Sequence, residues 1–157
     1  MDKKFKVGLI RVLTTEDQDV LLAHERQIMK YFPDLEVETK CIPDQYDGIH
    51  SPELSDQALP KIIETAKSFH DVDMFIVSCA DDPGVEELRK VFPGIPVTGG
   101  GETTVALALK YGSRIGVLVS QIMHLRHIAG WYLIRSFLQD LRCPQYTGSY
   151  DSVRDER

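Results

Sequence analysis

The chain has 157 residues, of which 43% are hydrophobic and 27% are charged. This composition is typical of a single folded domain with a buried core, and it excludes a disordered or low-complexity protein. The formal net charge of −6 argues against a protein that coats nucleic acid, and no apolar stretch approaches the length of a membrane span. The three cysteines form no CxxC pair and cannot all be paired, and the first residues show no signal-peptide pattern. We therefore expect a reducing, cytoplasmic setting.

Strands and helices are predicted to alternate along most of the chain. The apolar and alternating segments that predict strands are residues 5–13, 35–42, 74–79, 95–98 and 115–119. Helical spacing is found from the cap at residues 14–17 to Pro33, and over about residues 55–69, 85–91 and 103–111. Residues 43–52 are rich in Pro, Gly and Asp, and form a candidate lid loop. Within this series, residues 5–13 read as a strand buried on both faces and residues 35–42 as an edge strand.

Repeated β-α units of this length predict an α/β fold, a parallel sheet with helices on both faces, of the Rossmann-like or flavodoxin-like kind. Ligands of such sheets bind at the carboxyl ends of the strands. That rule gathers residues 11–15, residues 79–84, residues 99–103 and Ser120 around one crevice.

The last part of the chain differs in composition, because Lys is absent beyond Ser120. Residues 122–141 predict a helix that is apolar around much of its circumference, and residues 143–157 predict a loose polar tail. We therefore divide the chain into a lobe at 1–120, an apolar helix at 121–142 and a tail at 143–157. A helix of this kind needs a covering surface, which favours a homodimer.

Cys79 ends the predicted strand 74–79 and precedes a turn into a helix. The amide N–H groups of that helix start favour a thiolate, which is the reactive form of cysteine. The charges of Asp81 and Asp82 oppose it, because like charges disfavour ionisation. A buried structural cysteine is the alternative interpretation.

Three glycines at 99–101 open the next helix, and their N–H groups can hold an anion such as a carboxylate; a plain tight turn is the alternative. The segment lacks the pattern of a nucleotide-binding loop. His124 and His127 are three residues apart with Cys143 beyond, which is too little for a metal site, so we expect none. The chain also lacks the GxSxG motif of a serine hydrolase.

Three segments follow one another at predicted strand ends: VSCADDPG at 77–84, IPVTGGGE at 95–102 and RIGVL at 114–118. In this order they resemble the aspartate/glutamate/hydantoin racemase superfamily, most closely its hydantoin racemase branch. The resemblance covers about residues 5–120.

The resemblance implies racemisation without a cofactor, at a carbon next to the carboxylate or carbonyl of an amino acid or hydantoin. In the family, one cysteine removes the Cα proton as a thiolate and a second returns a proton to the opposite face as a thiol. Cys79 matches the first of these cysteines. The resemblance also implies a set of substrate contacts: Thr14, Thr15, Ala80, Asp81, Asp82, Gly100, Gly101, Glu102 and Ser120.

Members of the family usually have two α/β lobes, and the second cysteine lies in a Cys-Thr-Gly-like segment of the second lobe. This chain resembles the first lobe only, and Cys143 lies in no such segment. We expect residues beyond about 120 to replace the second lobe, through truncation or a change of reading frame. Three functions remain open: a racemase that is weakly active or inactive, a single-cysteine decarboxylase or lyase, and a carboxylate-binding remnant without catalysis. The expected partner is a small carboxylate or hydantoin, with no nucleic acid and no membrane.

Overall fold

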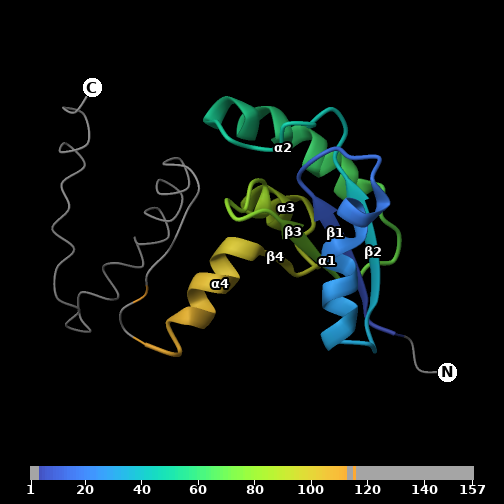
Figure 1. Cartoon of the computed structure of the whole chain (residues 1–157), viewed down its shortest axis with the longest axis vertical. Helices are drawn as coiled ribbons and strands as arrows, with labels where there is room; N and C mark the ends of the chain where they lie inside the picture. Colours follow the sequence, from blue (N-terminus) through green and yellow to red (C-terminus); the bar gives the residue numbers. More distant parts are fainter. Residues whose placement is uncertain (1–3, 113–114, 116–157) are drawn as a thin grey trace, which may run out of the picture.

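The β-α repeats inferred from the sequence are present in the computed structural model, which describes residues 4–112 and 115. In chain order the elements are β1 (Lys6–Arg11), α1 (Gln18–Tyr31), β2 (Glu36–Cys41), α2 (Pro52–Lys67), β3 (Met74–Ser78), α3 (Val85–Val91), β4 (Val97–Gly99) and α4 (Gly100–Ala108). The four strands form one sheet in the order β2-β1-β3-β4, and every neighbouring pair is parallel. Figure 1 shows α1 beside β1 and β2, and α4 leading away from the end of β4. The prediction of an α/β fold with a parallel sheet is confirmed.

The strand order creates a switch point between β1 and β3. The chain leaves β1 toward β2 on one side, and it leaves β3 toward β4 on the other. Right-handed crossovers then put α1 on one face of the sheet and α2 and α3 on the opposite face. Crevices at such points are where ligands of open parallel sheets bind.

Side chains of the central strands pack on opposite faces of the sheet, as this arrangement requires. On one face, Ile10 and Val77 pack in the main apolar core with Ala58 and Ile62 of α2 and Leu88 of α3. On the other face, Ser78 of β3 makes a hydrogen bond with His24 of α1. Since β1 is buried over Val7–Arg11, its apolar run from the sequence matches a central strand covered on both sides.

Local signals in the sequence explain most element boundaries. Asp17 caps α1, since its side chain accepts hydrogen bonds from the amides of Asp19 and Val20. Strand β2 is at an edge of the described sheet, as its alternation predicted. Helix α3 begins and ends where the sequence predicted, at Val85 and Val91.

Two helices begin earlier than the sequence predicted. Helix α2 starts at Pro52, because Ser51 caps it and proline is favoured in a first helical turn, so the preceding loop is shorter than expected. Helix α4 starts at Gly100, so two of the three glycines lie in its first turn. Its Gly101 and Glu102 amides are capped by Asp82, far away in the sequence, in addition to the local contact of the Glu102 side chain with the Gly99 amide.

The expected fifth strand, the helix at 122–141, the tail at 143–157 and Ser120 lie outside the described residues, apart from Ile115. The same holds for the division of the chain at residues 120 and 142. Within residues 4–112, no helix is both long and apolar enough to cross a membrane.

Candidate functional site

Cys79 directly follows β3, at the carboxyl edge of the sheet and beside the switch point. Its side chain is partly buried and packs against the core on the α2 and α3 face. It belongs to the β3–α3 turn, residues 79–84, in which the amide of Asp82 donates to the Cys79 carbonyl over 3.3 Å. The position expected for a reactive group of this fold is therefore occupied by a thiol.

Burial decides the ionisation of this thiol. Desolvation is the main cause that raises the pKa of Cys79 to about 11, and the negative charges of Asp81 and Asp82 contribute to the same rise. Hydrogen bonds from the amides of Asp81 and Ala80 lower the pKa, but they do not offset the burial. The sequence-based expectation of a thiolate is therefore wrong for this state of the protein, because turn amides that favour the anion act on a sulfur with little solvent around it. At neutral pH the group is a proton-carrying thiol.

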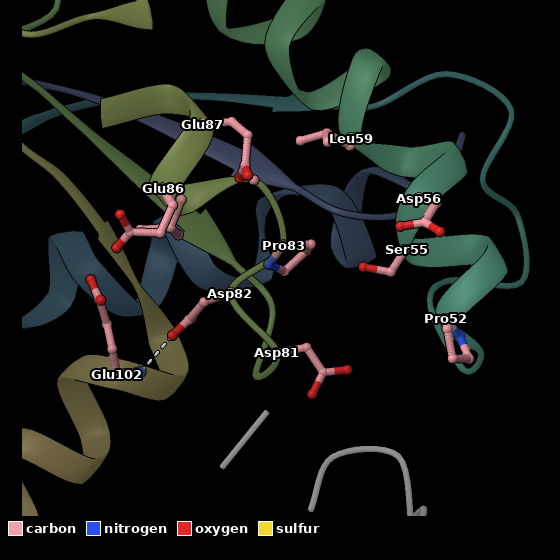
Figure 2. Close-up of a pocket in the computed structure, with 12 residues that line it drawn as sticks. Pro52, Ser55, Asp56, Leu59, Asp81, Asp82, Pro83, Glu86, Glu87 and Glu102 are labelled. Carbon is pink, nitrogen blue, oxygen red and sulfur yellow. Dashed lines mark hydrogen bonds between the residues drawn. The ribbon is translucent and has the colours of Figure 1, made fainter. Parts of the chain in front are cut away.

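Asp82 occupies the amides that open α4. Its Oδ1 accepts from the N–H of Gly101 over 2.8 Å, and its Oδ2 accepts from the N–H of Glu102 over 2.5 Å. Figure 2 shows the Asp82 side chain pointing from the turn toward the first turn of α4. The amides of Gly101 and Glu102, which the sequence proposes as contacts of a substrate, are thus already occupied by one of the chain's own carboxylates.

The Glu102 side chain is also engaged within the protein. It pairs with Arg89 of α3 and accepts a hydrogen bond from the Gly99 amide over 3.2 Å. Arg89 in turn donates to the Val97 carbonyl over 3.0 Å and pairs with Glu86. These contacts join α3, β4 and the start of α4 behind the turn of Cys79.

A hollow of about 360 Å³ lies between α2 and the β3–α3 turn. Figure 2 shows Ser55 and Asp56 of α2 on one side of it and Asp82 and Glu102 on the other. Carboxylates dominate its lining: Asp56, Asp81, Asp82, Glu86, Glu87 and Glu102. Cys79 is not part of the lining, so the hollow adjoins the turn without containing the thiol. In the described part of the chain, no group of three potential metal ligands is suitably placed to hold a metal ion.

The other residues that the sequence suggested as substrate contacts have different surroundings in the structure. The Thr14 hydroxyl donates to the Ile42 carbonyl over 2.5 Å and accepts from the Gln45 amide over 2.8 Å, so it holds the loop after β2. The Thr15 hydroxyl accepts from the Asp17 amide at the start of α1. Ala80 and Gly100 are exposed. Among the substrate contacts suggested by resemblance, the Thr14 and Thr15 hydroxyls therefore already have partners.

The sequence placed Arg11 near the crevice, but it gave no role to the polar cluster that Arg11 forms with His24 and Ser78 on the α1 face of the switch point. Arg11 ends β1 and is in register with Cys41 of β2 and Ser78 of β3. His24 Nδ1 lies 2.5 Å from the Ser78 hydroxyl. The available signal was a single arginine within the apolar run of residues 7–13.

The fold and this edge of the sheet define an α/β protein with a cysteine and an arginine on opposite faces of its switch point. A family model described as Asp/Glu/Hydantoin racemase matches residues 7–127. The chain therefore belongs to the Asp/Glu/hydantoin racemase family, which supports a racemase-type function. A search of curated proteins gives no match to it.

Proposed function

We propose that the protein transfers a proton at a carbon next to a carboxylate or carbonyl, without a cofactor, and that Cys79 carries the proton. The observation that carries this proposal is the position of Cys79, at the carboxyl end of β3 beside the switch point of a racemase-family fold. The substrate class is amino acids or their hydantoin derivatives, as for the family.

The chemistry needs two states of sulfur. In the forward direction a thiolate takes the Cα proton, the C–H bond breaks, and its electron pair moves into the neighbouring carbonyl as an enolate-like anion. Return of a proton from a thiol to carbon completes the reaction. With a pKa of about 11, Cys79 is a thiol at neutral pH, so in its resting state it is suited to give the proton rather than to remove it. Preorganised N–H groups must stabilise the anion, and the amides of the turn at Ala80 and Asp81, which hydrogen-bond the sulfur, are candidates for this role.

A single-face reaction is the second candidate, and the raised pKa of Cys79 favours it. A decarboxylase needs only a thiol that protonates one face of an enolate. In the described part of the chain the other cysteine is Cys41, which ends β2 on the far side of β1. Cys41 shares the α1 face with Arg11, whereas Cys79 packs on the opposite face. Inversion would require a second proton donor from elsewhere, such as a second copy of the chain.

The experiment uses the complete chain and each enantiomer of aspartate, glutamate and a 5-substituted hydantoin in heavy water. Loss of the Cα–H signal in NMR spectra measures exchange, and chiral chromatography measures inversion. Exchange with inversion that disappears in Cys79→Ser supports the racemase. Exchange with retention supports one-face proton transfer, because a single thiol returns its proton to the face it came from.

Cys41→Ser is the matched control, and it should leave the exchange unchanged. Absence of exchange with every substrate, in the wild type as in Cys79→Ser, would contradict proton removal at carbon. It would leave a decarboxylase acting on another carboxylate, or the carboxylate-binding remnant, as the function.

The cellular setting and assembly are part of the same proposal. We infer a cytoplasmic protein, because Cys41 and Cys79 are both free thiols and a proton-transferring thiol needs a reducing environment. We also propose a homodimer through the apolar segment at residues 121–142, which lies outside the described residues.

A further inference from the structure

Arg11 is a buried cation at the carboxyl end of the central strand. Only 6% of its surface is exposed. Among the described residues, its Nε and Nη1 atoms have no hydrogen-bond partner, and no carboxylate forms an ion pair with it. A guanidinium remains charged in proteins, and burying it without a partner is strongly unfavourable. A buried guanidinium without a partner in the protein is therefore suited to bind an anion.

The position of Arg11 relates this anion site to the proposed chemistry. Arg11 pairs in register with Ser78, the residue before Cys79, on a strand that lies about 4.8 Å away in a sheet of this kind. The two strands flank the switch point, where ligands of such sheets bind. A small substrate lying across the strand ends can therefore meet Cys79 from one face and Arg11 from the other.

The charges around Cys79 and Arg11 favour one orientation of a bound substrate, with its carboxylate toward Arg11. The hollow beside the β3–α3 turn is lined by carboxylates, which repel a substrate carboxylate. The amides of Gly101 and Glu102 already hold Asp82. In the described part of the chain, Ser78, Cys41 and His24 lie near Arg11 on the α1 face, and none of them carries a fixed negative charge.

We propose that Arg11 binds the carboxylate of the substrate, and that the substrate is therefore an open-chain carboxylate such as an amino acid rather than a neutral hydantoin. The identity of the anion as substrate rests on the proposed function; the anion site itself does not. Guanidinium groups recognise carboxylates through charge-assisted hydrogen bonds, which are about twice as strong as neutral ones. A hydantoin ring offers only carbonyl oxygens to the same donors.

The test observes the side chain of Arg11 directly. In the full-length protein labelled with ¹⁵N, the Nε–H signal of Arg11 is assigned by its loss in Arg11→Lys. Acetate and succinate are then titrated at constant ionic strength, with sodium chloride and 5-methylhydantoin as comparison ligands. We expect a saturable shift of this signal with both carboxylates and little shift with chloride or the hydantoin. A signal that ignores the carboxylates, or that follows chloride or the hydantoin equally, would overturn the proposal.

Variants distinguish a free carboxylate from a carboxylate of the chain itself. Arg11→Met should weaken carboxylate binding by about tenfold or more while its melting temperature without ligand stays equal or rises, because an unpaired buried charge is removed. Arg26→Met is the matched control: Arg26 is an exposed arginine of α1 paired with Asp19. A melting temperature several degrees lower for Arg11→Met, with no ligand response in the wild type, would mean that Arg11 already has an internal partner. That result would also overturn the proposal.

Cys79→Ser separates this proposal from the proposed function. Carboxylate binding at Arg11 should persist in Cys79→Ser, where proton exchange is lost. Exchange without binding at Arg11 would refute the anion site alone, and binding without any exchange would refute proton transfer alone.

Discussion

Gly99 and Asp82 lie so close together that a Cβ atom at position 99 would stand 2.0 Å from Oδ1 of Asp82. The contact belongs to the cap of α4, in which the Asp82 carboxylate accepts from the amides of Gly101 and Glu102. Any side chain at position 99 must push this carboxylate away from the helix. Gly99→Ala should therefore lower the free energy of unfolding by about 1–3 kcal/mol, the usual cost of overpacking.

Gly94 provides the matched control in urea denaturation. A Cβ built on Gly94 meets no atom within 4 Å, and the backbone there does not have the left-handed conformation. Gly94→Ala should leave the free energy of unfolding within about 1 kcal/mol of wild type. Equal effects of the two substitutions would contradict the close contact between Gly99 and Asp82.

Asp82 links the cap of α4 to the ionisation of Cys79. Asp82→Asn keeps one acceptor oxygen but puts an N–H donor group against a second amide, so we expect a loss of about 1 kcal/mol in the free energy of unfolding. The same substitution removes a negative charge that raises the pKa of Cys79, so that pKa should fall. Asp56→Asn, at an exposed position of α2, is the control and should change neither quantity.

The fold was predictable because its determinants are local. Apolar runs marked the strands of the sheet, and Asp17 and Pro33 marked the two ends of α1. The start of α2 was missed for a local reason too, since Pro52 is favoured both in loops and in a first helical turn. The start of α4 was missed for a different reason, because its Glu102 amide is capped by Asp82 in another turn.

The candidate site was only partly predictable. Cys79 was found because a strand end is recognisable in the sequence. The raised pKa of Cys79 could not be predicted, because the burial of its side chain depends on which helices pack around the turn. Arg11 stood out as a charge within an apolar run, but its lack of a partner is a property of the assembled sheet.

The reactivity of Cys79 should have an unusual pH dependence. In a Cys41→Ser/Cys143→Ser background, alkylation by iodoacetamide should rise with pH toward a midpoint near 11, because only the thiolate reacts. At pH 7 the thiolate fraction is roughly two to three orders of magnitude below that of an ordinary thiol with a pKa near 8.5. Greater nucleophilicity of the more basic sulfur offsets about one of these orders, so we expect a rate reduced by about tenfold or more.

The same variant unfolded in urea is the reference for an ordinary cysteine. Its alkylation midpoint should return to about 8.5, where unperturbed thiols titrate. A folded-state midpoint at or below that of the unfolded chain would contradict the burial of Cys79. It would also restore the thiolate as the resting form.

His24 should report the charge of Arg11. Partial burial lowers the pKa of His24, and the positive charge of Arg11 lowers it further. Arg11→Met should therefore raise the pKa of His24, measured from the Cε1–H signal across a pH titration, while Arg26→Met should leave it unchanged.

Because the pKa of His24 is lowered in the folded state, the stabilising contribution of neutral His24 is complete above about pH 6.5 and is lost as the pH falls through the folded-state value. Saturation with acetate should raise the pKa of His24 in the wild type but not in Arg11→Met, since the bound anion offsets the arginine charge. The same rise in both proteins would show that acetate acts on His24 by another route.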